Sequence, residues 1–203
     1  MSSKKIDLFS QFSSVDEAMR WCKALVHLMK PFISNNGACI VIDIDGTLLN
    51  PATLRAIPPV VDLAQYAYHH KIPIHIVTAR VDVENNRLVT LEHLANIGLR
   101  LRHSKVGAGR GRPIAYYDSL SMRSAREFQN NNFSGFKYRA RCNLPQPVLL
   151  NIGDQWEDLI RRPPYAKTKR EQILSNAFSA MPPGNVYVGQ LSDCSWFSVK
   201  VPA

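Results

Sequence analysis

The chain has 203 residues, 45% of them hydrophobic, and its 25 basic and 16 acidic residues give a formal net charge of +9. A chain of this length can bury one good α/β core and is short for two domains, so we expect a single domain over residues 1–203. No run approaches the ~20 consecutive apolar residues of a membrane helix, so no membrane association is expected.

Two features of the sequence indicate the cellular compartment, namely the first twelve residues and the cysteines. Residues 1–12 lack the apolar core of a secretory signal. The four cysteines (Cys22, Cys39, Cys142 and Cys194) lie far apart without Cys-x-x-Cys spacing, which argues against a zinc site or a disulfide framework. We therefore expect reduced thiols and a cytoplasmic protein.

The first half of the chain shows regular patterns. Ser14-Val15-Asp16-Glu17 is typical of a capping box and predicts an amphipathic helix to about residue 30, within an N-terminal helical segment over 1–37. Further elements are expected as a buried strand at 38–43, a helix near 58–70, a strand ending at Thr78, a helix at about 82–97 ended by Gly98, and a strand near 99–106.

The second half is less regular. An irregular stretch is expected up to Gly135, and an apolar strand begins at Val148. After a break at Pro163-Pro164 we expect a helix near 167–179 and two strands at 186–190 and 196–201. This alternation of helices and apolar strands predicts an α/β fold with a parallel sheet, which residues 161–203 complete.

Two aspartates follow the first buried strand. In Asp43-Ile44-Asp45-Gly46-Thr47-Leu48, strand alternation points Asp43 and Asp45 the same way, and Gly46 then bends the chain. Carboxylates at the carboxyl end of a strand lie where open α/β sheets bind ligands. They repel each other unless a cation joins them or one takes a proton. The alternative is an ordinary strand that ends in an Asp-Gly turn.

This hexapeptide resembles the first motif of the haloacid dehalogenase-like (HAD) phosphohydrolases. The apolar strand that ends in Thr78 is similar to their second motif, and Asn151-Ile152-Gly153-Asp154-Gln155-Trp156-Glu157-Asp158 is similar to the fourth. The sequence of the fourth motif resembles that of the acid phosphatase branch of this superfamily. This branch includes plant vegetative storage proteins and bacterial class B acid phosphatases. The resemblance spans roughly residues 38–160 and implies a HAD-like (Rossmannoid) fold. Ala79 departs from the family, because many relatives have glycine after the threonine.

The lysine of the third motif has two candidates. Lys137 has an arginine four residues later, Arg141, as the branch usually shows, and on a helix both would share one face. Arg123-Ser124 competes as a variant in which arginine replaces the lysine. We prefer Lys137, because arginine does not substitute freely for a compact ammonium group.

The resemblance implies a role for each matching residue. Asp43 would attack the phosphorus of a monoester and form a phospho-aspartate, and Asp45 would act as general acid and base. Thr78 and Lys137 would hold the phosphoryl oxygens. Gly46, Ala79 and Arg80 would contribute to substrate binding.

The same resemblance implies Mg²⁺ as the cofactor. Asp43, the backbone carbonyl of Asp45 and Asp154 would be its ligands, since Mg²⁺ prefers oxygen ligands. Asp158, one helical turn beyond Asp154, would orient a water in the coordination shell.

The spacing of the motifs limits what covers the site. Only 35 residues separate Asp43 from Thr78, enough for one helix and one strand. The interval of 59 residues from Thr78 to Lys137 leaves room for a small flap but not for a folded cap. We therefore expect a capless site or one with a small flap.

Basic residues are concentrated near the proposed site. Residues 100–142 contain ten basic residues against Asp118 and Glu127, and Gly107-Ala108-Gly109-Arg110-Gly111-Arg112 is a glycine-rich cationic loop. Such a run is often only a solubilising surface, but beside a phosphate site Arg110 and Arg112 would steer anionic substrates.

Three functions follow from these patterns. The preferred one is a Mg²⁺-dependent phosphomonoesterase acting on a phosphorylated small molecule. An alternative with the same active site acts on phosphorylated nucleic-acid ends, although few aromatic residues interleave the basic ones. The second alternative is a catalytically silent storage or binding protein, against which the intact Asp43, Asp45, Thr78 and Asp154 argue.

Overall fold

The computed structural model describes residues 9–102, 113–130, 133–160, 184–190 and 194–202, together with residues 172 and 182. In chain order the helices and strands are β1 (Phe9–Phe12), α1 (Val15–Asn36), β2 (Cys39–Ile42), α2 (Pro58–His69), β3 (Ile74–Val81), α3 (Glu84–Asn96), β4 (Leu99–Leu101), β5 (Ala115–Tyr117), β6 (Ser119–Arg123), α4 (Ala125–Gln129), α5 (Phe133–Cys142), β7 (Val148–Gly153), α6 (Trp156–Leu159), β8 (Val186–Gly189) and β9 (Ser195–Lys200).

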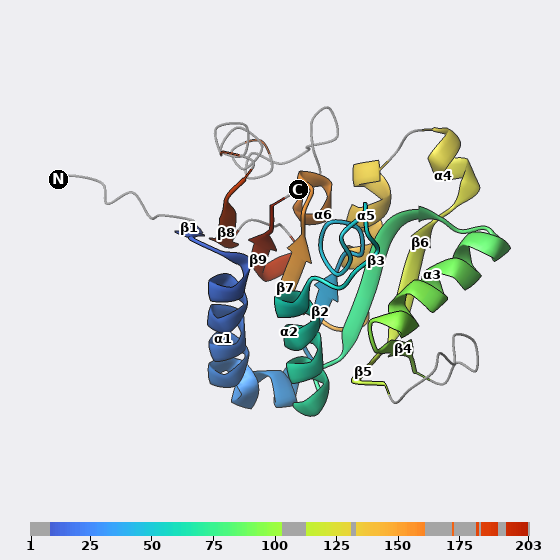
Figure 1. Cartoon of the computed structure of the whole chain (residues 1–203). Helices are drawn as coiled ribbons and strands as arrows, with labels where there is room; N and C mark the ends of the chain where they lie inside the picture. Colours follow the sequence, from blue (N-terminus) through green and yellow to red (C-terminus); the bar gives the residue numbers. More distant parts are fainter. Residues whose placement is uncertain are drawn as a thin grey trace.

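A seven-stranded sheet in the order β1-β8-β9-β7-β2-β3-β6 forms the centre of the molecule (Figure 1). The five strands from β9 to β6 are mutually parallel, while β8 runs antiparallel to both β9 and β1. This mostly parallel sheet, flanked by helices, confirms the predicted α/β class. β4 and β5 form a separate two-stranded sheet.

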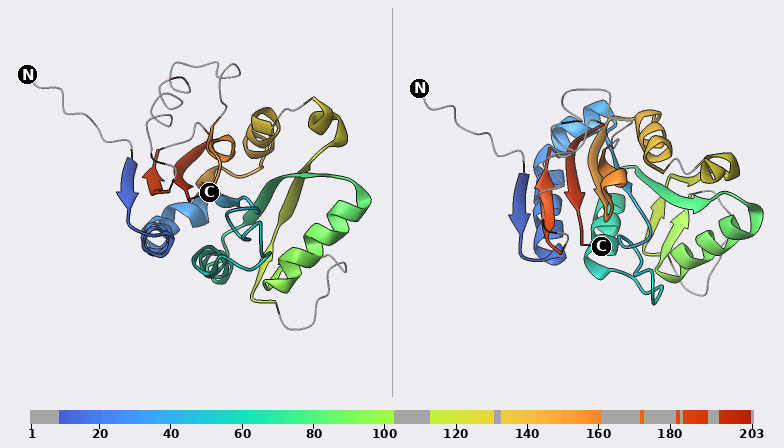
Figure 2. Two further views of the ribbon diagram at one scale, coloured as in Figure 1. Left: turned by 45° about the horizontal axis from the view of Figure 1, so that its top comes forward. Right: turned by 90° about the horizontal axis from the view of Figure 1, so that it is seen from above.

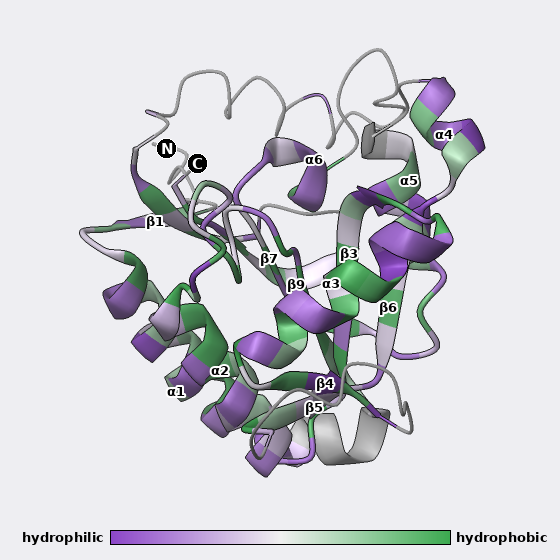
Figure 3. Ribbon diagram, turned by 45° about the vertical axis from the view of Figure 1, so that its right-hand side comes forward, coloured by the Kyte–Doolittle hydropathy of each residue, from purple (hydrophilic) through white to green (hydrophobic). Residues whose placement is uncertain are grey.

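Helices cover both faces of the sheet (Figure 2). α1 and α2 pack on one face, where Met19 and Leu63 join Ile40, Ile42 and Ile76 in the main hydrophobic core. α5 lies on the other face, where Phe136 joins a smaller cluster that includes Val41 and Val77. The residues of β2 alternate between the two clusters, which explains why this strand is apolar throughout. Polar residues lie on the outer sides of the helices (Figure 3).

The N-terminal segment differs from its prediction. β1 pairs with β8 at the edge of the sheet, so 1–37 is not helical throughout. Ser14 begins α1 as expected, since its hydroxyl accepts the N–H of Glu17 at 3.2 Å, but the Glu17 carboxylate returns to Ser13 instead of Ser14. The helix also continues past the predicted end, through Pro31 to Asn36.

The segment between Thr78 and Gly135 is more regular than expected. β6 lies beside β3 in the main sheet, and β4 ends at Leu101, well before the predicted residue 106. β6 was missed because Ser-Leu-Ser-Met-Arg is short and half polar, so its pattern resembles that of a loop. The final two strands are confirmed as β8 and β9. The helix expected near 167–179 lies almost entirely outside the described residues.

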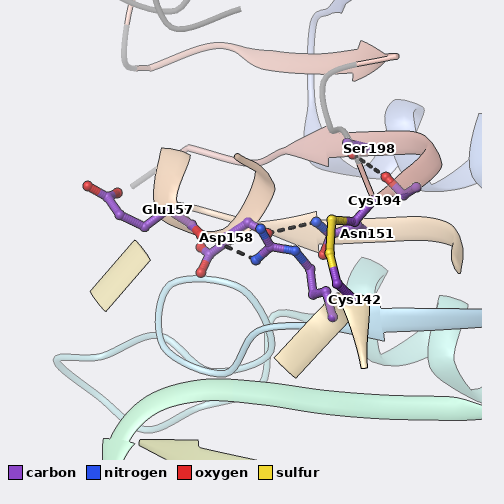
Figure 4. Close-up of a disulfide and its surroundings, with 8 residues drawn as sticks. Cys142, Asn151, Glu157, Asp158, Cys194 and Ser198 are labelled. Carbon is purple, nitrogen blue, oxygen red and sulfur yellow. Dashed lines mark hydrogen bonds between the residues drawn. A yellow bond between two sulfur atoms is a disulfide. The ribbon is translucent and has the colours of Figure 1, made fainter. Parts of the chain in front are cut away.

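The prediction of four reduced cysteines is wrong for one pair. Cys142, the last residue of α5, forms a disulfide with Cys194, which lies just before β9 (Figure 4). The two residues are 52 positions apart, but their Cα atoms lie 5.9 Å from each other. Cys22 and Cys39 are free and buried, and burial raises the pKa of each thiol to about 12. The disulfide removes the cysteine argument for a reducing compartment.

Among the described residues, no helix combines the length and the apolar content needed to cross a membrane.

Candidate active site

The loop after β2 turns back on itself at Gly46. The N–H groups of Leu48 and Leu49 both donate to the carbonyl of Ile44, at 2.8 and 2.9 Å. Gly46 has a φ of +77°, and a Cβ atom at this position would lie 2.3 Å from Asp154 Oδ2. Glycine is therefore required twice here, for the left-handed backbone and for the approach of the Asp154 carboxylate.

Three buried carboxylates meet where β2 and β7 end. Asp43, Asp154 and Asp158 are 4%, 7% and 3% exposed, and each offers an oxygen within 4.8 Å of the others. β2 and β7 are parallel neighbours, so their carboxyl ends lie at the same edge of the sheet. Asn151 holds Asp158 in place, since its Nδ2 donates to the Asp158 carbonyl at 2.7 Å (Figure 4).

Lys137 reaches this cluster from α5. Its Nζ donates to Asp43 Oδ1 at 2.8 Å and also pairs with Asp158 Oδ1. The competing Arg123 is buried at the end of β6, where its guanidinium lies 4.6 Å from the centre of the Phe128 ring. Of the two predicted candidates, Lys137 is therefore the one that contacts the aspartates.

The crowding of charges shifts the pKa values of the site. Burial, followed by the neighbouring Asp158, raises the pKa of Asp43 well above its usual range, although Lys137 opposes this. Burial and Asp158 also raise the pKa of Asp154, to about 6. Burial alone would lower the pKa of Lys137, but Asp158 and Asp43 outweigh it and raise that pKa. Among the described residues, only the Lys137 ammonium group pairs directly with these three carboxylates, so the cluster is short of positive charge.

This cluster fits a divalent cation. Asp154 Oδ1 is buried and has no hydrogen-bond partner in the described part of the chain, while its Oδ2 accepts from Gln155 Nε2 at 2.8 Å. An orphaned buried carboxylate oxygen is costly unless a cation or a water takes it up. Oxygen ligands are those that Mg²⁺ prefers. Asp45, whose predicted contribution was a backbone carbonyl, keeps its carboxylate outside this group of three.

A cavity of about 440 Å³ opens beside the cluster. Its lining residues are Asp43, Asp45, Pro51, Thr78, Ala79, Lys137, Asp154, Gln155 and Glu157. Thr78 is 1% exposed, and its Oγ1 accepts the N–H of Arg80 at 3.3 Å. The segment from Asp43 to Thr78 contains one loop and α2 before β3 begins, so it holds no cap domain.

Arg80 and Asp45, two of the predicted site residues, form an ion pair with each other. Arg80 Nε donates to Asp45 Oδ2 at 2.9 Å, and Arg80 Nη2 to Oδ1 at 2.6 Å. This pair could not be predicted from the sequence, because 35 residues separate its members. Arg110 and Arg112, predicted to steer substrate, lie outside the described residues.

Other groups near the cluster were not predicted from the sequence. Gln155 and Glu157 line the cavity, and both stand inside the fourth motif, so that motif was the signal for them. Lys200, on β9, is 4% exposed, and its Nζ lies 5.4 Å from the centre of the Trp156 ring. Its charge lowers the pKa of Asp154, against the larger effects of burial and Asp158. Lys200 follows no motif, so no pattern could have indicated it.

The model of the HAD superfamily, subfamily IIIB (acid phosphatase), matches residues 49–180, which is more than half of the chain. The chain belongs to this family. It is therefore a phosphatase, a phosphoric monoester hydrolase with a HAD-like fold. A search of curated proteins gave no match.

The matched segment of this phosphatase contains four of the six residues predicted for catalysis or metal binding, namely Thr78, Lys137, Asp154 and Asp158. The matched segment begins six residues after Asp43, so it does not include Asp43 or Asp45. The assignment of these two residues to the site depends on the hexapeptide motif and on their position in the structure.

Proposed function

We propose that this phosphatase hydrolyses small phosphate monoesters through a phospho-aspartate on Asp43. The observation that carries the proposal is the contact of the buried Asp43 carboxylate with Lys137, at the wall of an open cavity. A nucleophile for phosphoryl transfer needs this combination of a reachable carboxylate and a nearby positive charge that offsets the charge of the phosphate.

Mg²⁺ is the proposed cofactor. Asp43, Asp154 and the backbone carbonyl of Asp45 would hold it, with Asp158 within reach to orient a coordinated water. When bound, the ion would supply the positive charge that lets a carboxylate approach a dianionic phosphate.

The residues of the chain divide the chemistry among them. An Asp43 carboxylate oxygen attacks the phosphorus, and the bond from phosphorus to the ester oxygen breaks. Asp45 gives a proton to the departing oxygen and later takes one from the water that cleaves the phospho-aspartate. Lys137 and the Thr78 hydroxyl hold the phosphoryl oxygens through both steps.

The proposed substrate is a phosphorylated small molecule. A cavity of about 440 Å³ accommodates a small phosphate ester, since ligand pockets usually measure about 300–1,000 Å³. Phosphorylated nucleic-acid ends are the alternative substrate, and their recognition would rely on Arg110 and Arg112.

A screen of phosphate release tests this proposal. Sugar phosphates, nucleotides, phosphoproteins and end-phosphorylated oligonucleotides would be compared with Mg²⁺ and with excess chelator. We expect release from small monoesters only with the metal, and none by Asp43→Asn, which keeps the shape of the side chain but loses the attacking charge. If Asp43→Asn keeps more than a few per cent of the activity, Asp43 is not the nucleophile.

A further inference from the structure

The Asp45–Arg80 pair is a two-point contact between the proposed general acid and a guanidinium group. Both Asp45 oxygens accept from Arg80, at 2.9 and 2.6 Å. The Arg80 side chain is 17% exposed and that of Asp45 is 40% exposed. A fork-to-fork contact of this kind fixes the orientation of both groups as well as their separation.

Helix α3 supports Arg80 from the side away from Asp45. Arg80 Nη1 contacts Thr90 Oγ1 at 3.4 Å and His93 Nδ1 at 3.3 Å. Thr90 and His93 are three positions apart on α3 and therefore share one helix face. All three guanidinium nitrogens thus have a partner, and the contacts to α3 favour the orientation in which Arg80 holds Asp45.

This closed pair conflicts with the proton transfer expected of Asp45. A general acid must turn one of its oxygens toward the leaving group, but both Asp45 oxygens face the Arg80 guanidinium and accept from it. Phosphate is an equally good bidentate partner for arginine. Asp45 and the neighbour of Arg80, Ala79, both line the cavity in which the phosphate would lie.

We propose that the Asp45–Arg80 pair is a latch, which Thr90 and His93 hold closed and the phosphoryl group of the substrate opens. The proposal rests on the proposed function. On opening, the guanidinium moves from the Asp45 carboxylate to the phosphoryl oxygens. Asp45 then takes a proton from solvent, gives it to the ester oxygen as the phosphorus–oxygen bond breaks, and is left as a carboxylate. Thr90 and His93 are positioning residues that touch neither the substrate nor the reacting atoms.

The latch makes a prediction about affinity whose direction is unusual. When only a fraction of the protein is open, the apparent dissociation constant is the intrinsic constant divided by that fraction. Removing a contact that holds the latch closed should therefore tighten phosphate binding. Loss of one such hydrogen bond should lower KM, and the dissociation constant of inorganic phosphate, about 3- to 10-fold, with kcat within about twofold.

Two variants on α3 test the latch. Thr90→Val removes the Oγ1 acceptor at a buried position, and His93→Phe removes the Nδ1 acceptor at a half-buried one. His93→Asn is the conservative variant, because its Oδ1 keeps an acceptor near the place of Nδ1, and it should behave as the wild type. His69→Phe, on the exposed end of α2, is the matched control for the loss of an imidazole.

The measurements are KM and kcat for a small monoester, and calorimetric titration of inorganic phosphate, on the Mg²⁺-loaded full chain. Lower KM and tighter phosphate binding in Thr90→Val and His93→Phe, restored in His93→Asn, support the latch. Unchanged or weaker binding in both variants overturns it. If the wild type hydrolyses no monoester, the proposed function fails, but the phosphate titration still tests the latch. Should Thr90→Val fail to fold by circular dichroism, His93→Phe decides alone.

Discussion

Gly46 connects the backbone of the first motif with the carboxylate of the fourth. Its φ of +77° belongs to the left-handed region, and its missing side chain leaves space for Asp154. Any Cβ atom would push against Asp154 Oδ2, the oxygen that also accepts from Gln155. The absence of a Cβ at Gly46 therefore lets the Asp154 carboxylate approach the loop that follows β2.

The first prediction follows from this contact. Gly46→Ala should lower the free energy of unfolding by about 1–3 kcal/mol, because an L-residue with positive φ is strained. It should also lower kcat/KM about 100-fold, since a displacement of about 1 Å at Asp154 misplaces the site. Urea unfolding and steady-state kinetics measure the two effects. Gly184→Ala is the control, because a Cβ there would meet no atom within 4 Å among the described residues beyond its chain neighbours. Equal behaviour of the two variants would refute the role given to Gly46.

Some of the site residues could be predicted from the sequence and others could not. Asp43 and Asp154 were predictable, because each directly follows an apolar strand and parallel strands bring such ends together. The Asp45–Arg80 pair was not, since it depends on how α3 places Thr90 and His93 behind the guanidinium. A pattern read along the chain carries no information about that direction.

At the scale of elements, α5 is tied to the sheet by a covalent bond. The Cys142–Cys194 disulfide joins the end of this helix to the segment before β9, and five positions earlier the helix carries Lys137. Arg141 adds a contact, since its Nη1 donates to the Glu157 carbonyl at 3.2 Å. The pairing depends on β9 lying next to β7, a neighbour relation that cysteine spacing does not reveal.

Loss of this bond should destabilise the protein. The disulfide closes a loop across 52 positions, and loops of this size are expected to contribute about 2–4 kcal/mol. A reducing agent should therefore lower the urea midpoint of the wild type, and the double variant Cys142→Ser/Cys194→Ser should show the lower midpoint without it. In that variant the reducing agent should change nothing. If the reducing agent does not change the urea midpoint of the wild type, the Cys142–Cys194 disulfide would be contradicted.

A buried histidine links β3 to β6 and to the loop before β7. His75 Nδ1 lies 2.7 Å from Ser119 Oγ, and its Nε2 lies 3.1 Å from Gln146 Oε1. Burial lowers the pKa of His75, against the weaker opposing effects of Gln146 and Asp118. Between about pH 6.5 and the lowered pKa of the folded state, His75 is therefore protonated in the unfolded chain but neutral in the folded chain.

The sign of this linkage gives a pH prediction. The contribution of His75 is fully present above about pH 6.5 and is lost as the pH falls toward the folded pKa, so acid should weaken the fold in this window. His75→Gln cannot titrate, and its free energy of unfolding should fall less between pH 7.5 and pH 5.5 than that of the wild type. His69→Gln, at an exposed position, is the control for the loss of an imidazole. Parallel slopes for all three proteins would contradict the assignment.

At the scale of the whole molecule, the order of strands explains the site. β2 lies between β7 and β3, so Asp43, Asp154 and Thr78 reach the same edge of the sheet from three parallel neighbours (Figure 1). α5 then brings Lys137 from the face opposite to α1 and α2. The parallel centre was predictable from alternating helices and apolar strands. The antiparallel edge was not, because β1 and β8 pair across most of the chain length.

Asp43 is the residue that we propose carries the phosphoryl group during turnover. The most direct test is to quench the Mg²⁺-loaded enzyme in acid during turnover of a small monoester and to map the phosphorylated residue by mass spectrometry. We expect phosphate on Asp43 in the wild type and on no residue in Asp43→Asn. A phosphorylated residue other than Asp43, or turnover by the wild type without any phosphorylated residue, would contradict it.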